Sequence, residues 1–137
     1  MNSYIDGRNI YFSDEITEAT MGWLTFKIQS INLSDNEEEE KLKDYTRKPI
    51  NLYISSYGGS VYDVLGAYDI IKQSKTKVNT YGFGKCMSAG LTLFLAGEER
   101  SVYKNTTVMF HSLAGVWWGC CRKKSTLLKN IKDYKKG

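Results

Sequence analysis

The sequence has one histidine and one proline among its 137 residues, and it has no run of about 18 apolar residues that could form a transmembrane helix. Its three cysteines, Cys86, Cys120 and Cys121, have no metal-site spacing. The N-terminus carries Asp6 and Arg8 instead of the apolar core of a secretory signal. We therefore expect a cytoplasmic protein with free thiols, no metal and no membrane partner.

The chain also lacks the G-x-x-x-x-G-K-[ST] phosphate loop, so any use of ATP must belong to a partner. The net charge of +4 is concentrated in residues 122–137, which hold seven Lys or Arg and one Asp. No aromatic residues are arranged beside these charges to stack on bases. We interpret this segment as a solvated helix face and expect no nucleic-acid partner. The length of the chain predicts a single domain over residues 1–137.

The first third of the chain predicts a short strand over Asn9–Phe12 and a helix capped by Ser13 or Asp14. Apolar residues then recur at helical spacing on one face, at Met21, Leu24, Ile28 and Ile31. Residues 33–48 are polar and include four consecutive glutamates. We interpret them as a charged loop or helix extension and assign them no function.

The middle of the chain predicts a βαβ unit. Ile50–Ser56 alternates apolar and polar residues as a strand does, Tyr57–Ser60 forms a turn, and Val78–Phe83 is the next strand. A capping box of Ser60 and Asp63 opens the helix between the strands. Its apolar face consists of Val61, Val64, Leu65, Tyr68 and Ile71. The two strands should therefore run parallel.

The chain is organised around Tyr81–Gly90, in which glycines follow a strand and an apolar helix, Ser88–Ala96, begins. The first N–H groups of a helix have no intrahelical acceptor, so they can stabilise an oxyanion beside a nucleophilic hydroxyl. Ser88 is thus a candidate nucleophile. The alternative is that it only caps the helix, as serine commonly does.

Two further short strands are expected at Arg100–Tyr103 and Thr107–Phe110, and His111 follows the second directly. If consecutive crossovers place the strand ends on one rim of the sheet, His111 can face Ser88 and act as its general base. The alternative is a structural histidine. A loop with Gly115 and Gly119 and a final amphipathic helix within residues 122–137 complete the prediction.

The sequence resembles the Clp protease proteolytic subunit, the ClpP family of serine peptidases. The resemblance rests on N-L-Y-I-S-S-Y-G-G-S-V (Asn51–Val61), Ala67–Ile70, G-K-C-M-S-A-G (Gly84–Gly90), V-M-F-H (Val108–His111) with Gly115, and more weakly Arg8–Phe12 with Ile16. These blocks span nearly the whole chain in the family's order. The resemblance implies an α/β fold, a ClpP/crotonase-like spiral of ββα units with a mainly parallel sheet, in which residues 122–137 would form an incomplete handle helix.

The resemblance further implies a role for each matching residue. Ser88 would be the nucleophile, His111 the general base, and the backbone N–H groups of Gly59 and Ala89 the oxyanion hole. The reaction would be hydrolysis of unfolded polypeptides through an acyl-enzyme, without a cofactor. The implied partners are identical subunits in stacked heptameric rings and an AAA+ unfoldase of the ClpX, ClpA or ClpC type, which would use the ATP.

Two features depart from the family pattern. Tyr57 stands where the family has a proline before its glycine pair. The triad carboxylate of the family lies well beyond its histidine, whereas Asp133 is the only acid after His111 and falls in the predicted helix, so we do not assign it that role. Losing such a carboxylate typically lowers turnover by about 10⁴-fold. The chain is either a fragment of a longer protein or a weak enzyme that needs a carboxylate from elsewhere.

Four alternatives remain open at this point. The chain could be a catalytically impaired ClpP-like subunit with a structural or regulatory role in a ring. It could be an acyl-CoA enzyme of the related crotonase type. Lys85 could serve as the base of a Ser–Lys peptidase, and Cys86 could be the nucleophile, although only Lys85 could lower the pKa of its thiol.

Overall fold

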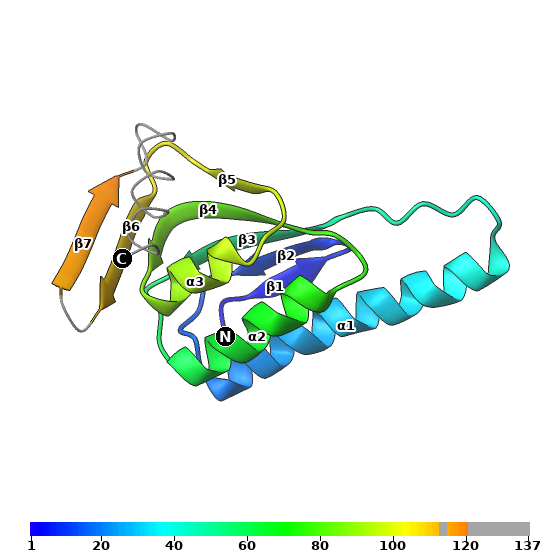
Figure 1. Ribbon diagram of the computed structural model, residues 1–137, viewed down its shortest axis with the longest axis horizontal. Helices are drawn as coiled ribbons and strands as arrows, with labels where there is room; N and C mark the ends of the chain where they lie inside the picture. The colour runs from blue at the N-terminus through cyan, green and yellow to red at the C-terminus, as the bar shows by residue number, and fades with distance from the viewer. Residues whose placement is uncertain (113–114, 121–137) are drawn as a thin grey trace.

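The computed structural model describes residues 1–112 and 115–120, and it has an α/β fold (Figure 1). The predicted strands Asn9–Phe12 and Ile50–Ser56 are confirmed with the expected bounds. The elements are β1 (Tyr4–Asp6), β2 (Asn9–Phe12), α1 (Glu18–Lys41), β3 (Ile50–Ser56), α2 (Val61–Gln73), β4 (Val78–Met87), α3 (Ala89–Leu95), β5 (Arg100–Val102), β6 (Thr107–Ser112) and β7 (Gly115–Cys120).

One mixed sheet carries all the described strands, in the order β1-β2-β3-β4-β6-β7 with β5 beside the first half of β4. β2, β3, β4 and β6 run parallel, while the outer pairs β1–β2 and β6–β7 are antiparallel. The predicted parallel βαβ unit is therefore confirmed. Parallel pairing places the C-terminal ends of β3, β4 and β6 on one rim of the sheet, where the functional site is expected.

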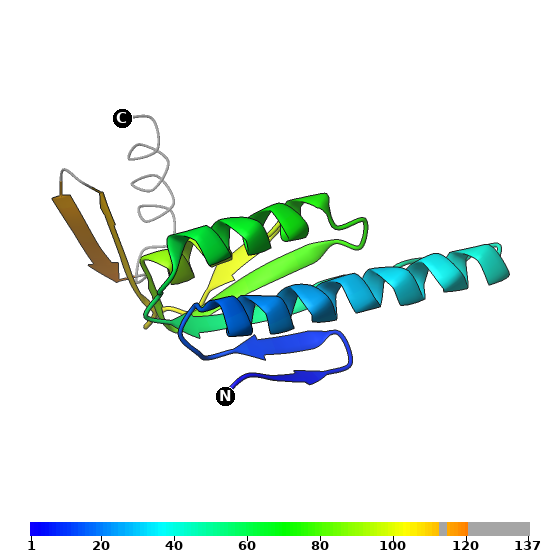
Figure 2. The ribbon, with the colours of Figure 1, turned by 90° about the horizontal axis from the view of Figure 1, so that it is seen from below.

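The core lies between the sheet and its helices. Figures 1 and 2 show α1 and α2 side by side on one face of the sheet. In Figure 2, α1 is drawn between α2 above it and the strands β1 and β2 below it. Alternate residues of β3 (Ile50, Leu52 and Ile54) are fully buried against these helices. The expected helix face is confirmed because Met21, Leu24 and Ile28 are buried, and Ile31 packs against the core.

The other face of the sheet carries a column of four tyrosines. Tyr4, Tyr11, Tyr53 and Tyr81 come from four neighbouring strands, and successive rings stack at centroid distances of 4.7 to 4.8 Å. Tyr53 and Tyr81 are also register partners, so the column follows the strand pairing. Cross-strand aromatic pairs of this kind stabilise a sheet and its register.

The structure corrects three expectations. Thr17, not Ser13 or Asp14, caps α1, because its side chain accepts the Thr20 N–H while the Thr20 side chain accepts the Thr17 N–H. β4 continues to Met87 instead of ending at Phe83. Gly115 and Gly119 lie in strand β7, not in a loop, because residues 115–120 pair with β6. The helix expected within residues 122–137 lies outside the described residues.

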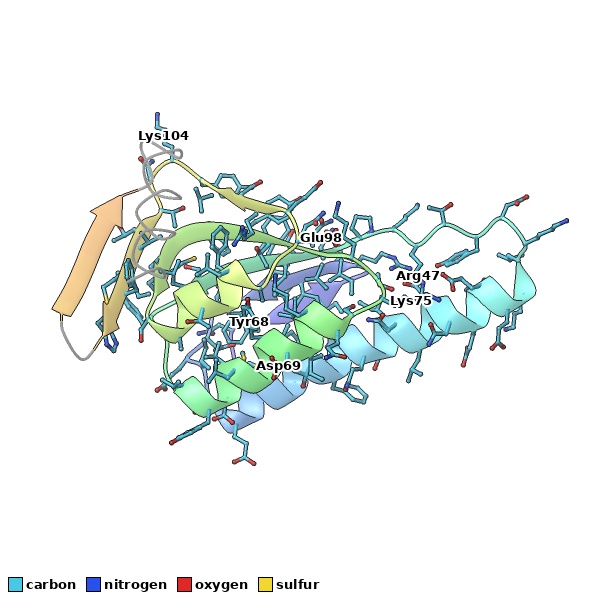
Figure 3. The ribbon with its side chains drawn as sticks, viewed as in Figure 1. Arg47, Tyr68, Asp69, Lys75, Glu98 and Lys104 are labelled. Carbon is cyan, nitrogen blue, oxygen red and sulfur yellow. The ribbon has the colours of Figure 1, made fainter. Side chains whose placement is uncertain are left out.

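Residues 33–48 form both a helix extension and a loop, the two structures considered from the sequence. α1 continues to Lys41, and a loop follows. Figure 3 shows Arg47 and Lys75 close together beside the last turns of α1, and both form ion pairs with Glu39, at 2.5 and 3.0 Å. The ion pair of Arg47 thus holds the loop after Lys41 against the end of α1. No helix in the described part of the chain is long and apolar enough to cross a membrane.

Candidate active site

Ser88 occupies the sharp turn between β4 and α3. It is the only described non-glycine residue with a positive φ, at 53°, a conformation that costs a residue with a Cβ about 1 to 3 kcal/mol. Its N–H donates to the carbonyl oxygen of Met109 in β6 at 2.6 Å, which ties the turn to the neighbouring strand. Ser88 stands at the N-cap position of α3, but its side chain makes no capping hydrogen bond. Its hydroxyl is directed elsewhere.

His111 provides the partner of that hydroxyl. β4 and β6 pair in parallel with Met87 opposite Met109, so the residues that follow each of these meet on one rim. Ser88 Oγ lies 3.0 Å from Nε2 of His111, within hydrogen-bond distance. His111 lies within β6, one residue inside the strand end, instead of after it as expected. The structure therefore brings together the serine and the histidine that the sequence singled out.

The turn at Gly58 and Gly59 packs directly against Ser88. A Cβ on Gly58 would lie 2.7 Å from the Met87 carbonyl oxygen and 3.0 Å from the Ser88 Cβ. Gly58 and Gly59 have φ values of 106° and 149°, which side-chain-bearing residues rarely adopt. Neither the Gly59 N–H nor the Ala89 N–H donates a hydrogen bond to a described residue. Both predicted oxyanion donors thus belong to segments that adjoin Ser88.

An apolar cavity of about 270 Å³ opens beside the serine and histidine. Side chains of α2 and α3 and Phe110 of β6 line it. The full set is Val61, Val64, Leu65, Ser88, Ala89, Leu91, Thr92, Leu95, Phe110 and His111. From the sequence, Val61, Val64 and Leu65 are expected only as part of an apolar helix face; Val64 is buried, whereas Val61 and Leu65 are exposed. The sequence did not identify Phe110 as part of the cavity lining, although its position next to His111 could have indicated it. The cavity has room for one apolar side chain of a ligand.

The two alternative nucleophile arrangements do not match the geometry. Lys85 Nζ lies 4.6 Å from the ring centroid of Tyr57 and 3.5 Å from Ser55 Oγ, and no contact with Ser88 is formed. Cys86 is fully buried, and its Sγ lies 3.4 Å from the Ile54 carbonyl oxygen, on the core side of β4. Lys85 is therefore not placed to deprotonate Ser88, and Cys86 is not placed to attack a ligand.

His111 has no carboxylate partner among residues 1–112 and 115–120, because no described Asp or Glu hydrogen-bonds to its ring. Asp133 lies outside the described residues. The described residues also contain no group of three or more His, Cys, Asp or Glu side chains that could hold a metal ion. The site thus combines a Ser–His pair, the N–H groups of Gly59 and Ala89 in adjoining segments, and an apolar cavity. These are the groups that acyl transfer uses.

Several known proteins are similar to this chain in sequence. A family model described as Clp protease matches residues 4–134. The ATP-dependent Clp protease proteolytic subunit 1 of Prochlorococcus marinus subsp. pastoris is 30% identical over 110 residues, which are 79% of this chain and 51% of the relative. The chloroplastic proteolytic subunit 3 of Arabidopsis thaliana is 25% identical over 136 residues, 98% of this chain and 41% of the relative.

Solved structures show the same similarity. A mutant ClpP1 from Listeria monocytogenes superimposes with a TM-score of 0.66 at 28% identity, covering 79% of this chain and 58% of that one. The ClpP protease catalytic domain from Plasmodium falciparum gives 0.65 at 26% identity, covering 79% and 54%. The chain therefore spans about half the length of the curated relatives and somewhat more than half of the solved structures.

Proposed function

Because this chain belongs to the Clp protease family, a family of serine peptidases, we propose that it is a Clp proteolytic subunit that hydrolyses peptide bonds through Ser88 and His111. The observation that supports this most is the distance of 3.0 Å between Ser88 Oγ and His111 Nε2. The proposal explains why a non-glycine residue adopts a positive φ there, since strained backbone is frequent at catalytic residues.

In the proposed reaction, Ser88 Oγ attacks the carbonyl carbon of the scissile bond while His111 Nε2 takes the hydroxyl proton. The N–H groups of Gly59 and Ala89 stabilise the negative charge on the carbonyl oxygen. The tetrahedral intermediate then collapses, the C–N bond breaks, and the departing amine takes the proton from Nε2. Water, deprotonated by the same nitrogen, hydrolyses the acyl-enzyme and restores Ser88. This chemistry needs no cofactor.

The proposed substrates are unfolded polypeptides, and the proposed partners are identical subunits in stacked heptameric rings together with an AAA+ unfoldase of the ClpX, ClpA or ClpC type. The names of the relatives support this part of the proposal, since they describe proteolytic subunits of ATP-dependent proteases. ATP would be used by the unfoldase. We place the assembly in the cytoplasm.

Labelling with a fluorophosphonate tests the function. The folded wild-type chain should form a covalent adduct at Ser88, and Ser88→Ala should form none. A matched control is Ser101→Ala in β5, which should label as the wild type does because Ser101 is outside the site. Absence of labelling in the folded wild type would contradict the proposal and favour a ring subunit with a structural or regulatory role, a role consistent with the missing carboxylate partner among the described residues.

The cavity beside Ser88 predicts a preference for an apolar side chain before the scissile bond. Its apolar lining should bind leucine or phenylalanine there, and full burial of such a side chain contributes about 1.5–3 kcal/mol. We expect kcat/KM for a leucine substrate to exceed that for its aspartate analogue by about 10- to 150-fold. Paired peptide esters that differ only at this residue would measure the ratio.

Leu65→Glu should reduce that ratio to near one, since it places a charge at the edge of the cavity. Leu33→Glu is the matched control because Leu33 is an exposed leucine of α1 that does not line the cavity. Equal kcat/KM values for both esters with the wild-type chain would show that the cavity does not select the substrate.

A further inference from the structure

The turn that carries Gly59 is held by the segment between β2 and α1. The N–H of Ile16 donates to the Gly58 carbonyl oxygen at 2.8 Å, and the N–H of Ser60 donates to the Ile16 carbonyl oxygen at 2.8 Å. The carbonyl of Gly58 and the N–H of Gly59 share one trans peptide plane and point in opposite directions. The bond from Ile16 therefore directs the Gly59 N–H away from Ile16.

Ser56 connects the same two segments through its side chain. It is the last residue of β3 and only 1% exposed. Its Oγ donates to the Asp14 carbonyl oxygen at 2.7 Å and accepts the Gly58 N–H at 3.1 Å. One buried hydroxyl thus bonds the N–H of Gly58 in the glycine turn and the carbonyl of Asp14, two residues before Ile16. Without it, the Asp14 carbonyl and the Gly58 N–H would lose this partner, and the bond to the Gly58 N–H is buried.

Ser56 also lies against α3, the helix that begins after Ser88. A Cβ on Gly90 would lie 2.8 Å from the Ser56 carbonyl oxygen and 3.1 Å from its Cβ. The residue is therefore in contact with the loop after β2, the glycine turn and the helix start. These are the three segments whose relative placement decides where the N–H groups of Gly59 and Ala89 point.

We propose that Ser56 is a positioning residue of the active site: its hydroxyl holds the Gly58–Gly59 turn so that the Gly59 N–H faces the carbonyl oxygen of a substrate bound at Ser88. This inference rests on the proposed function of Ser88. The Ser56 hydroxyl bonds the backbone of Asp14 and Gly58, and it forms no hydrogen bond with Ser88 or His111. Oxyanion donors act only when they are held in place before the reaction, and displacements of about 1 Å can cost about 10²-fold in rate.

The test is Ser56→Ala compared with Ser55→Ala in the full chain. Ser55 undergoes the same chemical change one residue away and is also buried, but the one hydrogen bond of its Oγ to a described residue is with Lys85, at 3.5 Å. We expect Ser56→Ala to lower kcat about 10- to 100-fold with KM within about twofold of wild type. Ser55→Ala should change neither. Hydrogen exchange of the Gly58 amide should accelerate at least about fivefold in Ser56→Ala alone.

Ser56→Cys fills the space of the hydroxyl with a slightly larger thiol that weakens both hydrogen bonds, so it should repeat the loss of kcat if the alanine variant folds poorly. The proposal is overturned if kcat stays within twofold of wild type in the alanine and cysteine variants, or if Gly58 exchange is unchanged. If the wild-type chain neither labels with fluorophosphonate nor turns over, the proposed function fails. Gly58 exchange then still decides whether Ser56 holds the turn.

Discussion

Acylation of Ser88 should slow by about 10²- to 10⁴-fold when His111 is replaced by alanine, the range that general acid–base catalysis supplies. The nitrogen that lies 3.0 Å from Ser88 Oγ is then lost, and no Asp, Glu or Lys among the described residues contacts the hydroxyl in its place. The measurement is the second-order rate constant of fluorophosphonate labelling. His111→Gln, which can hydrogen-bond but cannot take a proton, should be impaired to a similar degree.

Stability measurements separate this effect from misfolding. His111 is exposed, so its replacement should change the free energy of unfolding by no more than about 0.5 kcal/mol. An alanine variant that acylates within tenfold of the wild type would show that another group takes the Ser88 proton.

The parts of the fold set by local pattern were predictable. The sequence predicted β2 and β3 with the bounds that the structure has, β3 from its alternating apolar residues, and the short connection through a helix required parallel pairing of β3 and β4. Parallel pairing was also the reason to expect Ser88 and His111 on one rim. The contact between them could not be derived, because it depends on the register of β4 and β6, which pair directly.

The errors arose where distant partners decide the outcome. Asp14 is as good a helix cap as Thr17 by residue type, but its carboxylate accepts the Asn2 N–H at 2.9 Å and the Ser3 hydroxyl at 2.5 Å. The prediction ended β4 at Phe83 because glycines follow. In the structure Gly84, with φ at 66°, lies within the strand, where the register with β3 shifts. The glycines of β7 suggested a loop, and pairing with β6 overrides that preference.

The charged segment after Leu33 contains a residue, Asp35, whose structural role cannot be predicted from its neighbours in the sequence. Asp35, the fully buried carboxylate of α1, lies near the start of this segment. Arg8 binds both of its oxygens, at 2.5 and 3.0 Å, Tyr45 donates to Oδ1 at 2.6 Å and Thr76 donates to Oδ2 at 2.6 Å. These partners stand 10 to 41 positions away in the sequence. One carboxylate thereby joins the start of β2, the loop before β3 and the approach to β4.

Asp35→Asn should lower the free energy of unfolding by about 3 to 5 kcal/mol at pH 7, the cost typical of removing one partner from a buried ion pair. The amide cannot accept from all the groups that now converge on the carboxylate, and the charge of Arg8 loses its partner. Urea denaturation of both chains measures the difference. Asp44→Asn is the control, because Asp44 is exposed in the loop that follows α1 and its replacement should change stability by no more than about 0.5 kcal/mol.

The stability difference between wild type and Asp35→Asn should also depend on pH. The hydrogen bond from Arg8 is the main cause that lowers the pKa of Asp35 far below its ordinary value of 3.8, and the bonds from Thr76 and Tyr45 lower it further against the effect of burial. A carboxylate with a depressed pKa binds protons more weakly folded than unfolded, so its contribution is complete above about pH 5 and declines as pH falls below about 4. The two chains should therefore converge in stability toward pH 2. A difference that stays constant from pH 7 to pH 2 would show that the loss comes from packing instead of the charge of Asp35.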